Sequence, residues 1–375
     1  MRVLISCYEP KGYGGAATVA YEMCSAYQKI GIDAGYLNII SNFDADYFRY
    51  KYGANFGNPD NLKNVFTSFI DGELFYEPQP AVIQEVAKFK PDVILGFHYI
   101  APLVLKISVP DYPLVYFSVG CKQAQIYLEK FERSDATSLL KYIQDLDWPP
   151  KIYNQEEKKA VELANLIITP SRQTKRFYHA FFSQLEGKIH NRVFWLNSLI
   201  IHFVKKYQAN SKPFIDREVD VLFISNDWRR TEKNYPYVEA IAESLQDANI
   251  HIVGEIPYPI LGVSNHDTIP SFKSLYELMG NSKTIVSPSR LDAAPGILSE
   301  GIAMGCNIVA SRNCGNWELC NPNLLVEEFT PQGFVEKIKI SLKKKFSDNS
   351  EKIGTDKDIL DLLDLLISVK KIEWT

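Results

Sequence analysis

The apolar and polar stretches of the chain alternate in the way expected of successive strands and helices. Residues 2–7 form a short, almost continuous apolar run, which predicts a strand buried on both faces, as in a parallel sheet. A glycine-rich loop follows, and a helix is predicted from Thr18 to Lys29, where apolar residues recur at helical spacing until Gly31. Residues 34–39 form the next apolar run. The chain therefore begins with a strand, a helix and a strand.

The same alternation continues along the chain. In the first half it predicts further helices at residues 81–88, 101–107 and within 123–164, and further strands at 91–97, 113–119, 165–171 and 192–198. In the second half it predicts strands at 219–225, 249–255, 284–286 and 307–310, and helices at 237–245, 274–279 and 298–303. Residues 43–80 have no clear period, and we expect a long excursion from the sheet, where substrate contacts often lie.

A polar segment separates these two halves. Residues 205–220 are poor in aliphatic side chains, which is typical of a linker, and 375 residues suffice for two domains with cores of their own. We therefore expect an α/β chain with domains at 1–204 and 219–350 and a cleft between the carboxyl ends of their strands, where ligands bind in open α/β folds. Residues 351–375 repeat leucine and isoleucine at helical spacing, so we expect a helix that packs on another part of the chain, with the first half as the candidate.

The stretch from 283 to 319 carries the clearest chemistry. Pro295 and Gly296 stand where a helix begins, so free backbone N–H groups and the positive end of the helix dipole would form an anion site. Asp292 lies on the preceding loop and Glu300 about one turn into the helix. Two carboxylates beside an anion site suit hydroxyl groups of a ribose or a sugar. The pattern predicts a ligand that is polyhydroxylated and carries phosphate.

Three cations follow the first strand of the second half. Arg229, Arg230 and Lys233 lie within five residues, at the end of a strand where sites form in open α/β folds, and together they could neutralise a diphosphate without a metal. The alternative is a solvated charge patch, because surface Arg and Lys are common.

The glycines of the first loop allow a second backbone contact with phosphate. Gly14 and Gly15 would let the backbone approach closely, although they could also serve a turn that needs positive φ. The loop does not match G-x-G-x-x-G, and no acidic residue ends the second strand. A plain dinucleotide-binding fold is therefore disfavoured.

Composition excludes several classes of protein. A formal charge of -4 and a pI near 6.0 argue against nucleic acid as the main partner. None of the six cysteines stands at zinc-ligand spacing, and we expect reduced thiols rather than disulfides. No apolar run approaches the ~18 residues of a spanning helix, and Met1 leads directly into a strand without a signal peptide. We expect a cytoplasmic protein, of unknown oligomeric state.

A basic segment suggests contact with the inner face of a membrane. Residues 151–192 are basic, with Phe177, Tyr178, Phe181 and Phe182 between the charges. The basic residues named for this surface are Lys151, Lys158, Lys159, Lys175, Arg176, Lys188 and Arg192. Such a surface could lie on an anionic bilayer beside a lipid-linked acceptor. The alternative is a solvated helix whose aromatic side faces the core.

Asp292, the seven residues after it, and Glu300 resemble the acid-x7-acid signature of family 4 retaining glycosyltransferases of the GT-B fold, whose first acid is usually Glu. The resemblance extends through GIAMGCNIVASRNCGNWEL, the Gly14-Gly15 turn, NLIITPS, the Arg/Lys loop and IHIVGE. It implies two Rossmann-like domains facing across a cleft, with the C-terminal helix returning to the N-terminal one. It also implies transfer of a sugar from a UDP- or GDP-linked donor to a hydroxyl of a glycan or lipid-linked glycan, with retention and without cofactor or metal.

The resemblance assigns roles to individual residues. Glu300 would hold the donor ribose, and Asp292, one methylene shorter than the usual acid, would face the sugar hydroxyls. Arg229 or Arg230 and Lys233 would bind the diphosphate. Further contacts would come from the backbone N–H groups of Gly296, Ile297, Gly14 and Gly15, and from the loop at Ile269 and Pro270, beside the base.

The chain lacks a histidine at a position where members of this family often have one. Relatives often carry His after the strand that matches residues 113–119, where this chain has Ser118, Val119 and Gly120. His98 ends another strand at the expected cleft and is the remaining candidate, although it could equally be a structural His bonded to backbone. No nucleophile is evident, and in this family the leaving phosphate is usually thought to help deprotonate the acceptor.

Three other functions remain open. A GT-B epimerase would act on the same donor without an acceptor. A phosphorylase would need a lysine for pyridoxal phosphate and usually a longer chain. A catalytically silent nucleotide-sugar-binding or scaffold protein is compatible with the Asp292 change and with the absence of His at 118–120.

Overall fold

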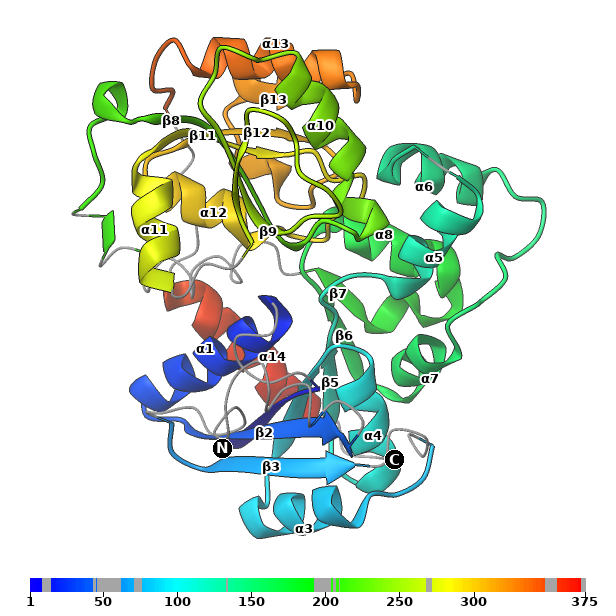
Figure 1. Ribbon diagram of the computed structural model, residues 1–375. Helices are drawn as coiled ribbons and strands as arrows, with labels where there is room; N and C mark the ends of the chain where they lie inside the picture. Colours follow the sequence, from blue (N-terminus) through cyan, green and yellow to red (C-terminus); the bar gives the residue numbers. More distant parts are fainter. Residues whose placement is uncertain are drawn as a thin grey trace. The chain divides into compact units, whose positions relative to one another are not determined.

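The computed structural model describes residues 1–8, 15–42, 45, 62–70, 76–132, 134–191, 204, 207–208, 210–267, 272–347 and 356–371. The chain divides into two compact units, each built on a sheet of its own (Figure 1). The first unit consists of Met1–Gln123, Pro149–Val193 and Thr355–Thr375, and the second of Ala124–Trp148 and Phe194–Gly354. The division thus differs from the expected one in two respects, because residues 124–148 and 194–204 both group with the second unit.

The first unit contains a parallel sheet of seven strands in the order β3-β2-β1-β4-β5-β6-β7. The strands are β1 (Arg2–Cys7), β2 (Asp33–Ser41), β3 (Val65–Ile70), β4 (Val93–Phe97), β5 (Leu114–Phe117), β6 (Leu166–Thr169) and β7 (Ile189–Asn191). The helices are α1 (Gly15–Lys29), α3 (Pro80–Phe89), α4 (Ile100–Ser108), α5 (Lys122–Lys130, most of which groups with the second unit), α7 (Gln155–Leu163), α8 (Arg172–Phe181) and α14 (Asp356–Lys371). Most central strands are buried along their whole length, which explains their continuous apolar runs.

The second unit contains six parallel strands in the order β10-β9-β8-β11-β12-β13. The strands are β8 (Val219–Asp227), β9 (Ile250–Glu255), β10 (Ser264–His266), β11 (Ser282–Ser287), β12 (Asn307–Ser311) and β13 (Leu325–Val326). The α-helices are α6 (Ala136–Gln144), α10 (Tyr235–Glu243), α11 (Phe272–Gly280), α12 (Gly296–Ala303) and α13 (Pro331–Ser341). Both sheets reverse their order once, after β1 in the first unit and after β8 in the second.

A glycine lets two strands of the second sheet approach where the candidate loop begins. Gly254 in β9 has φ +111, and a Cβ placed on it would lie 1.6 Å from the Ser225 carbonyl oxygen. The register of β8 against β9 shifts between Ile224 and Asp227, which marks a bulge in β8. The bulge lies directly before the loop that follows β8.

Most predicted elements are present, and the departures have simple causes. Strand β3 lies inside the stretch 43–80, of which the structure describes residues 45, 62–70 and 76–80. The strand expected at 192–198 lies outside the described residues, and β7 ends just before it. Helix α13 and the short strands β10 and β13 were not predicted. The tail forms α14, which contacts β4 in the first unit.

The basic segment of the first unit turns its aromatic residues inward. Phe177, Tyr178, Phe181 and Phe182 are all buried, so they are not part of a surface that a bilayer could contact. No helix in the described part of the chain combines the length and the apolarity needed to cross a membrane.

Candidate functional site

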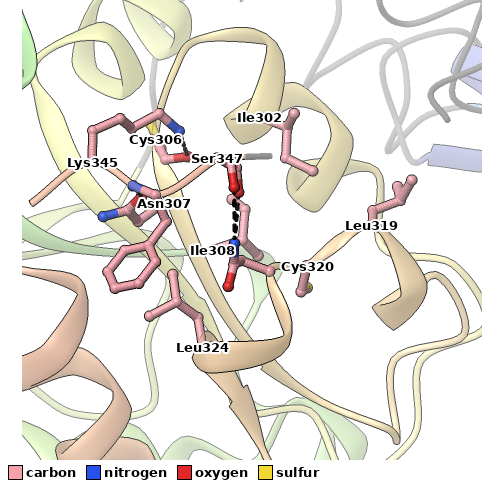
Figure 2. Close-up of a pocket in the computed structure, with 11 residues that line it drawn as sticks. Ile302, Cys306, Asn307, Ile308, Leu319, Cys320, Leu324, Lys345 and Ser347 are labelled. Atoms are coloured by element: carbon pink, nitrogen blue, oxygen red, sulfur yellow. Dashed lines mark hydrogen bonds between the residues drawn. The ribbon is translucent and has the colours of Figure 1, made fainter. Parts of the chain in front are cut away.

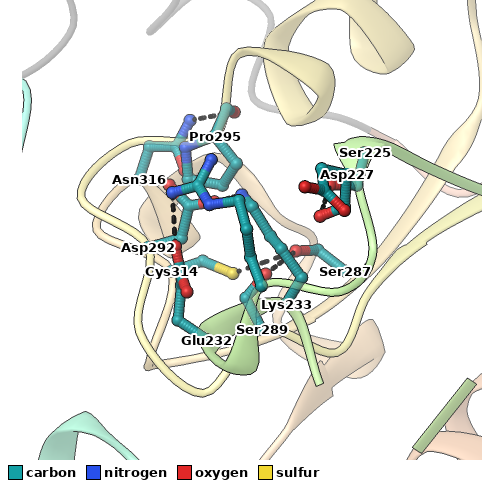
Figure 3. A network of polar contacts seen from close by, with 11 residues as sticks. Ser225, Asp227, Glu232, Lys233, Ser287, Ser289, Asp292, Pro295, Cys314 and Asn316 are labelled. Atoms are coloured by element: carbon teal, nitrogen blue, oxygen red, sulfur yellow. Dashed lines mark hydrogen bonds and ion pairs between the residues drawn. The ribbon is translucent and has the colours of Figure 1, made fainter. Parts of the chain in front are cut away.

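Two loops of the second unit meet at the point where its strand order reverses. One follows β8 and the other follows β11, which is the neighbour of β8 in the sheet. Ligands of open α/β folds bind at such switch points. Lys233 comes from the first loop and Asp292 from the second, and Lys233 Nζ lies 2.6 Å from Asp292 Oδ2 (Figure 3). Their side chains are only 19% and 15% exposed, so solvent screens this ion pair weakly.

Backbone hydrogen bonds hold the two loops together. The N–H of Arg290 donates to the Glu232 carbonyl at 2.8 Å, one residue before Lys233. The side chain of Asn234 donates to the Pro288 carbonyl at 3.1 Å, and Asn234 itself has φ 63, a left-handed conformation that Asn tolerates. The position of Lys233 is therefore fixed on both sides.

Asp292 is fixed by a third loop, which follows β12. Its N–H donates to the Asn313 carbonyl at 3.0 Å, and its own carbonyl accepts from the N–H of Gly315 at 2.8 Å. The same loop supplies Asn316, whose side chain donates to the Pro295 carbonyl at 2.9 Å (Figure 3). This bond anchors the residue that caps α12.

Cys314 lies under the ion pair as a neutral thiol. Burial raises its pKa to about 12, and the nearby charge of Asp292 acts in the same direction. Its Sγ lies 3.4 Å from Ser287 Oγ. The thiol therefore packs and hydrogen-bonds in the neutral form, with no thiolate available near neutral pH.

Helix α12 presents its first turn and one carboxyl group beside this loop. Its first N–H groups, at Gly296 and Ile297, have no acceptor within the helix. Glu300 is partly buried, and the loss of hydration raises its pKa to about 7. No described residue donates a hydrogen bond to its carboxyl group. A carboxyl group in this state is ready to accept hydrogen bonds from a ligand.

The two arginines of the loop after β8 are already paired with carboxylates. Arg229 Nε lies 2.8 Å from Asp227 Oδ1, and Arg229 also bonds Glu255 at the end of β9. The hydrogen bonds and charge of Arg229 lower the pKa of Asp227. Arg230 pairs with the nearly buried Glu232. The structure thus joins Lys233 to Asp292 directly, while Arg229 and Arg230 contact other acids.

His98 occupies the corresponding switch point of the first unit. It follows β4, which neighbours β1, and its φ of 61 is uncommon for a residue other than glycine. Burial, with a smaller effect of the Lys122 charge, lowers its pKa to about 4. Its Nδ1 is buried with no hydrogen-bond partner in the described structure, and its ring stacks on Tyr8 with centroids 6.3 Å apart. The bond to backbone that the structural alternative requires is therefore not seen at this nitrogen.

Comparison with known proteins identifies the architecture. Residues 218–344 match the model of a family described as glycosyl transferases group 1. Sucrose-phosphate synthase from Thermosynechococcus elongatus is 14% identical, with a TM-score of 0.66 over 98% of each chain. The fold is GT-B. Anabaena HepE, solved with UDP and glucose, is 13% identical, with a TM-score of 0.61 over 98% of this chain and 100% of that one.

GT-B structures of another activity are also similar. UDP-N-acetylglucosamine 2-epimerase from Rickettsia bellii is 12% identical, with a TM-score of 0.57 over 100% of this chain and 99% of that one. No curated protein matches the sequence. The predicted GT-B fold is confirmed, while identities at this level show the fold alone.

Several predicted contacts of the GT-B site lie outside the described residues. Gly14, Ile269 and Pro270 are among them, whereas Gly15 is described and begins α1. Within the described ranges, no group of three or more His, Cys, Asp or Glu side chains is arranged to hold a metal. A small pocket at the end of α12 and the start of β12 is lined by other residues, including Cys306, Asn307 and Lys345 (Figure 2).

Sequence reasoning missed one buried carboxyl group, at Glu157 in the first unit. It accepts hydrogen bonds from the N–H groups of Lys122 and Gln123 at 2.9 and 2.7 Å, at the start of α5, and from Tyr178 Oη at 3.0 Å. Burial raises its pKa to about 6. It lies in a charged helix in which one Glu among several shows no sign of being buried.

Proposed function

We propose that this chain is a retaining glycosyltransferase that moves a sugar from a UDP- or GDP-linked donor to a hydroxyl of a glycan or lipid-linked glycan. The observation that carries the proposal is the Lys233–Asp292 ion pair at the switch point of the second unit. It is supported by the carboxyl group of Glu300 on the helix that follows, which accepts no hydrogen bond from any residue that the structure describes. A nucleotide-diphosphate sugar requires a cation and a helix N-terminus for its phosphates, and a carboxylate that accepts hydrogen bonds from its hydroxyl groups.

Each group has a chemical task in this reaction. Cleavage of the bond between sugar and diphosphate develops negative charge on the leaving phosphate, which Lys233 and the first N–H groups of α12 stabilise. Asp292 accepts hydrogen bonds from the sugar, and Glu300 accepts them from the ribose. Arg230 and Arg229 assist only after exchanging a carboxylate for phosphate. These groups supply the required positive charge without a metal ion.

The hydroxyl group of the acceptor substrate must lose its proton during transfer. The departing phosphate takes up this proton. His98 is neutral above pH ~4, so its proposed role is that of a hydrogen-bonding group rather than of a cation. A lipid-linked acceptor would bring the protein to a membrane surface. Such contact would depend on the lysines of the basic segment, because its aromatic residues are buried.

A matched pair of variants tests the site. Lys283 Nζ lies 2.8 Å from Asp220 Oδ1, with both side chains 22% exposed, so this ion pair in the same unit resembles Lys233–Asp292. It lies at the first residues of β8 and β11, at the opposite sheet edge. We expect Lys233→Ala to abolish calorimetric binding of UDP or GDP and Lys283→Ala to retain it. Equal binding by both variants would contradict the proposal.

Turnover distinguishes the remaining functions. A panel of UDP- and GDP-sugars, incubated with EDTA and without acceptor, should yield slow hydrolysis that Glu300→Ala and Lys233→Ala both lose. Epimerisation of the sugar at one carbon, seen by NMR without release of the nucleotide, would indicate the epimerase. Binding without any turnover, also after addition of glycan acceptors, would indicate a silent binding protein. Activity that disappears with EDTA would contradict metal independence.

A further inference from the structure

A segment from the first half of the sequence is hydrogen-bonded to the loop that carries Asp292. Residues 134–137 lead into α6 and belong to the second unit. Arg290 Nε donates to the Ser134 carbonyl at 2.8 Å, and the N–H of Ala136 donates to the Arg290 carbonyl at 2.8 Å. We call this reciprocal pair of hydrogen bonds between Ser134, Ala136 and Arg290 the clasp.

The clasp uses a helix terminus that is organised independently of it. Asp135 caps α6 by accepting from the N–H of Ser138 at 2.8 Å, and Ser138 completes a capping box. Ala136 is the first residue of the helix, so its N–H has no acceptor inside α6. This N–H is instead used by Arg290. Ala136 is 1% exposed, so water cannot readily replace the bond.

From the clasp, short hydrogen-bonded paths lead to both members of the ion pair. The N–H of Arg290 bonds the carbonyl of Glu232, next to Lys233. Thr137 Oγ1 donates to Asn313 Oδ1 at 3.4 Å, and the Asn313 carbonyl accepts from the N–H of Asp292. Thus four elements share one network: the segment 134–137 and the loops after β8, β11 and β12.

We propose that Ser134–Thr137 positions the donor-binding loops, with Ala136 and Arg290 as positioning residues for the Lys233–Asp292 pair. The statement about the donor rests on the proposed function. Surface loops otherwise fluctuate locally, and a ligand must then overcome the entropy of ordering them. With the clasp in place, Lys233 and Asp292 are held in one geometry before the donor binds.

Each hydrogen bond of the clasp can be removed by a single substitution that spares the helix. Ala136→Pro deletes the donating N–H at the first helical position, where proline is favoured. Ala136→Ser enlarges the side chain but keeps the N–H, and Ser138→Ala weakens the capping box but leaves the clasp. Arg290→Gln removes the other hydrogen bond. If the clasp acts as proposed, Ala136→Pro and Arg290→Gln behave alike, and the two controls resemble the wild type.

Hydrogen exchange tests the positioning without any ligand. We expect the amides of Asp292 and Gly315 to exchange about tenfold faster in Ala136→Pro and Arg290→Gln, because local opening becomes easier by roughly one net hydrogen bond. The same amides in Ala136→Ser and Ser138→Ala should keep their wild-type rates. Equal exchange in all five proteins would overturn the inference.

Calorimetry with UDP and GDP tests the consequence for the donor. We expect the Kd of the nucleotide that the wild type binds to rise about tenfold in the two clasp variants, in proportion to the easier opening of the loop. An unchanged Kd despite faster exchange would overturn the role in donor binding. A wild type that binds neither nucleotide would instead contradict the proposed function, and hydrogen exchange would still decide whether the clasp positions the loop.

Discussion

Arg217 donates a hydrogen bond of 2.9 Å to the carbonyl of Met304, the residue that caps the C-terminal end of α12. The same guanidinium donates to the carbonyls of Ser282 and Lys212 at 2.7 and 3.0 Å and is 6% exposed. Within the described structure, no carboxylate forms an ion pair with Arg217. A cation at this helix end interacts favourably with the helix dipole. Arg217 therefore fixes one end of the helix whose other end faces the candidate site.

Loss of this guanidinium should destabilise the second unit. We expect Arg217→Ala to lower the free energy of unfolding by about 3 kcal/mol, because the buried bonds to the Ser282 and Met304 carbonyls and the partly buried bond to the Lys212 carbonyl all lose a charged donor. Arg217→Lys should recover part of the loss, since a single ammonium cannot reach all three carbonyls. Urea denaturation followed by tryptophan fluorescence measures both. Equal stability of Arg217→Ala and wild type would contradict this account of α12.

Replacement of Gly254 should be far more costly than replacement of another left-handed glycine. Gly254→Ala places a Cβ against the Ser225 carbonyl oxygen, and we expect a loss of more than about 3 kcal/mol. Gly262 has φ +77 with open space around its Cβ position, so Gly262→Ala should cost only about 1 kcal/mol. Thermal unfolding of the two variants tests the difference. Similar losses would mean that β8 and β9 separate easily.

Nucleotide affinity should depend on the ionisation of Glu300. Burial raises its pKa to about 7 from 4.5, so the carboxyl group costs the folded state more as pH rises through this interval. Ribose hydroxyls that donate to the carboxylate favour the charged form. We therefore expect affinity for UDP or GDP to increase from pH 6 to 8.

The control for this pH dependence is Glu300→Gln, which keeps the size of the side chain and cannot ionise. Its affinity should be weaker than that of the wild type at pH 8 and nearly constant between pH 6 and 8. Calorimetry in buffers of different ionisation enthalpy would also detect the proton released on binding. A wild type and a variant with the same pH profile would exclude Glu300 from the ribose contact.

His98 can be tested without disturbing its backbone. Asn tolerates the left-handed conformation that His98 adopts, so His98→Asn should keep the fold. We expect turnover to fall at least about tenfold, as for loss of one hydrogen-bonding group in the transition state. Because burial lowers the His98 pKa to about 4, wild-type turnover should show no loss attributable to this group between pH 8 and 6. Full turnover in His98→Asn would make it a structural residue.

The alternation of apolar runs and periodic helices was sufficient to predict the central strands of both sheets and the loops that carry Lys233 and Asp292. It could not predict β3, because that strand is half-exposed and lies in a polar, aromatic stretch. The ion-pair partners of Arg229 and Arg230 could not be predicted from the sequence either. Asp227 and Glu232 are neighbours in sequence, but whether a neighbouring acid pairs with an arginine or faces solvent depends on side-chain geometry.

Ser134 and Ala136 illustrate a different limit. They are bonded to Arg290 across more than 150 residues of sequence, and the stretch around them matches no motif. A buried backbone N–H leaves no mark on residue type, because every residue except proline carries one. Contacts of this kind become visible only when the fold has placed the segments together.

The grouping of Ala124–Trp148 with the second unit determines how the chain can be divided. A fragment that began at the linker near residue 205 would lack α6 and would expose the groups on Arg290 that Ser134 and Ala136 satisfy. The second unit is thus encoded by two separate stretches of the gene. A stand-alone version would require the 124–148 stretch to be rejoined to it, for example by permuting the chain.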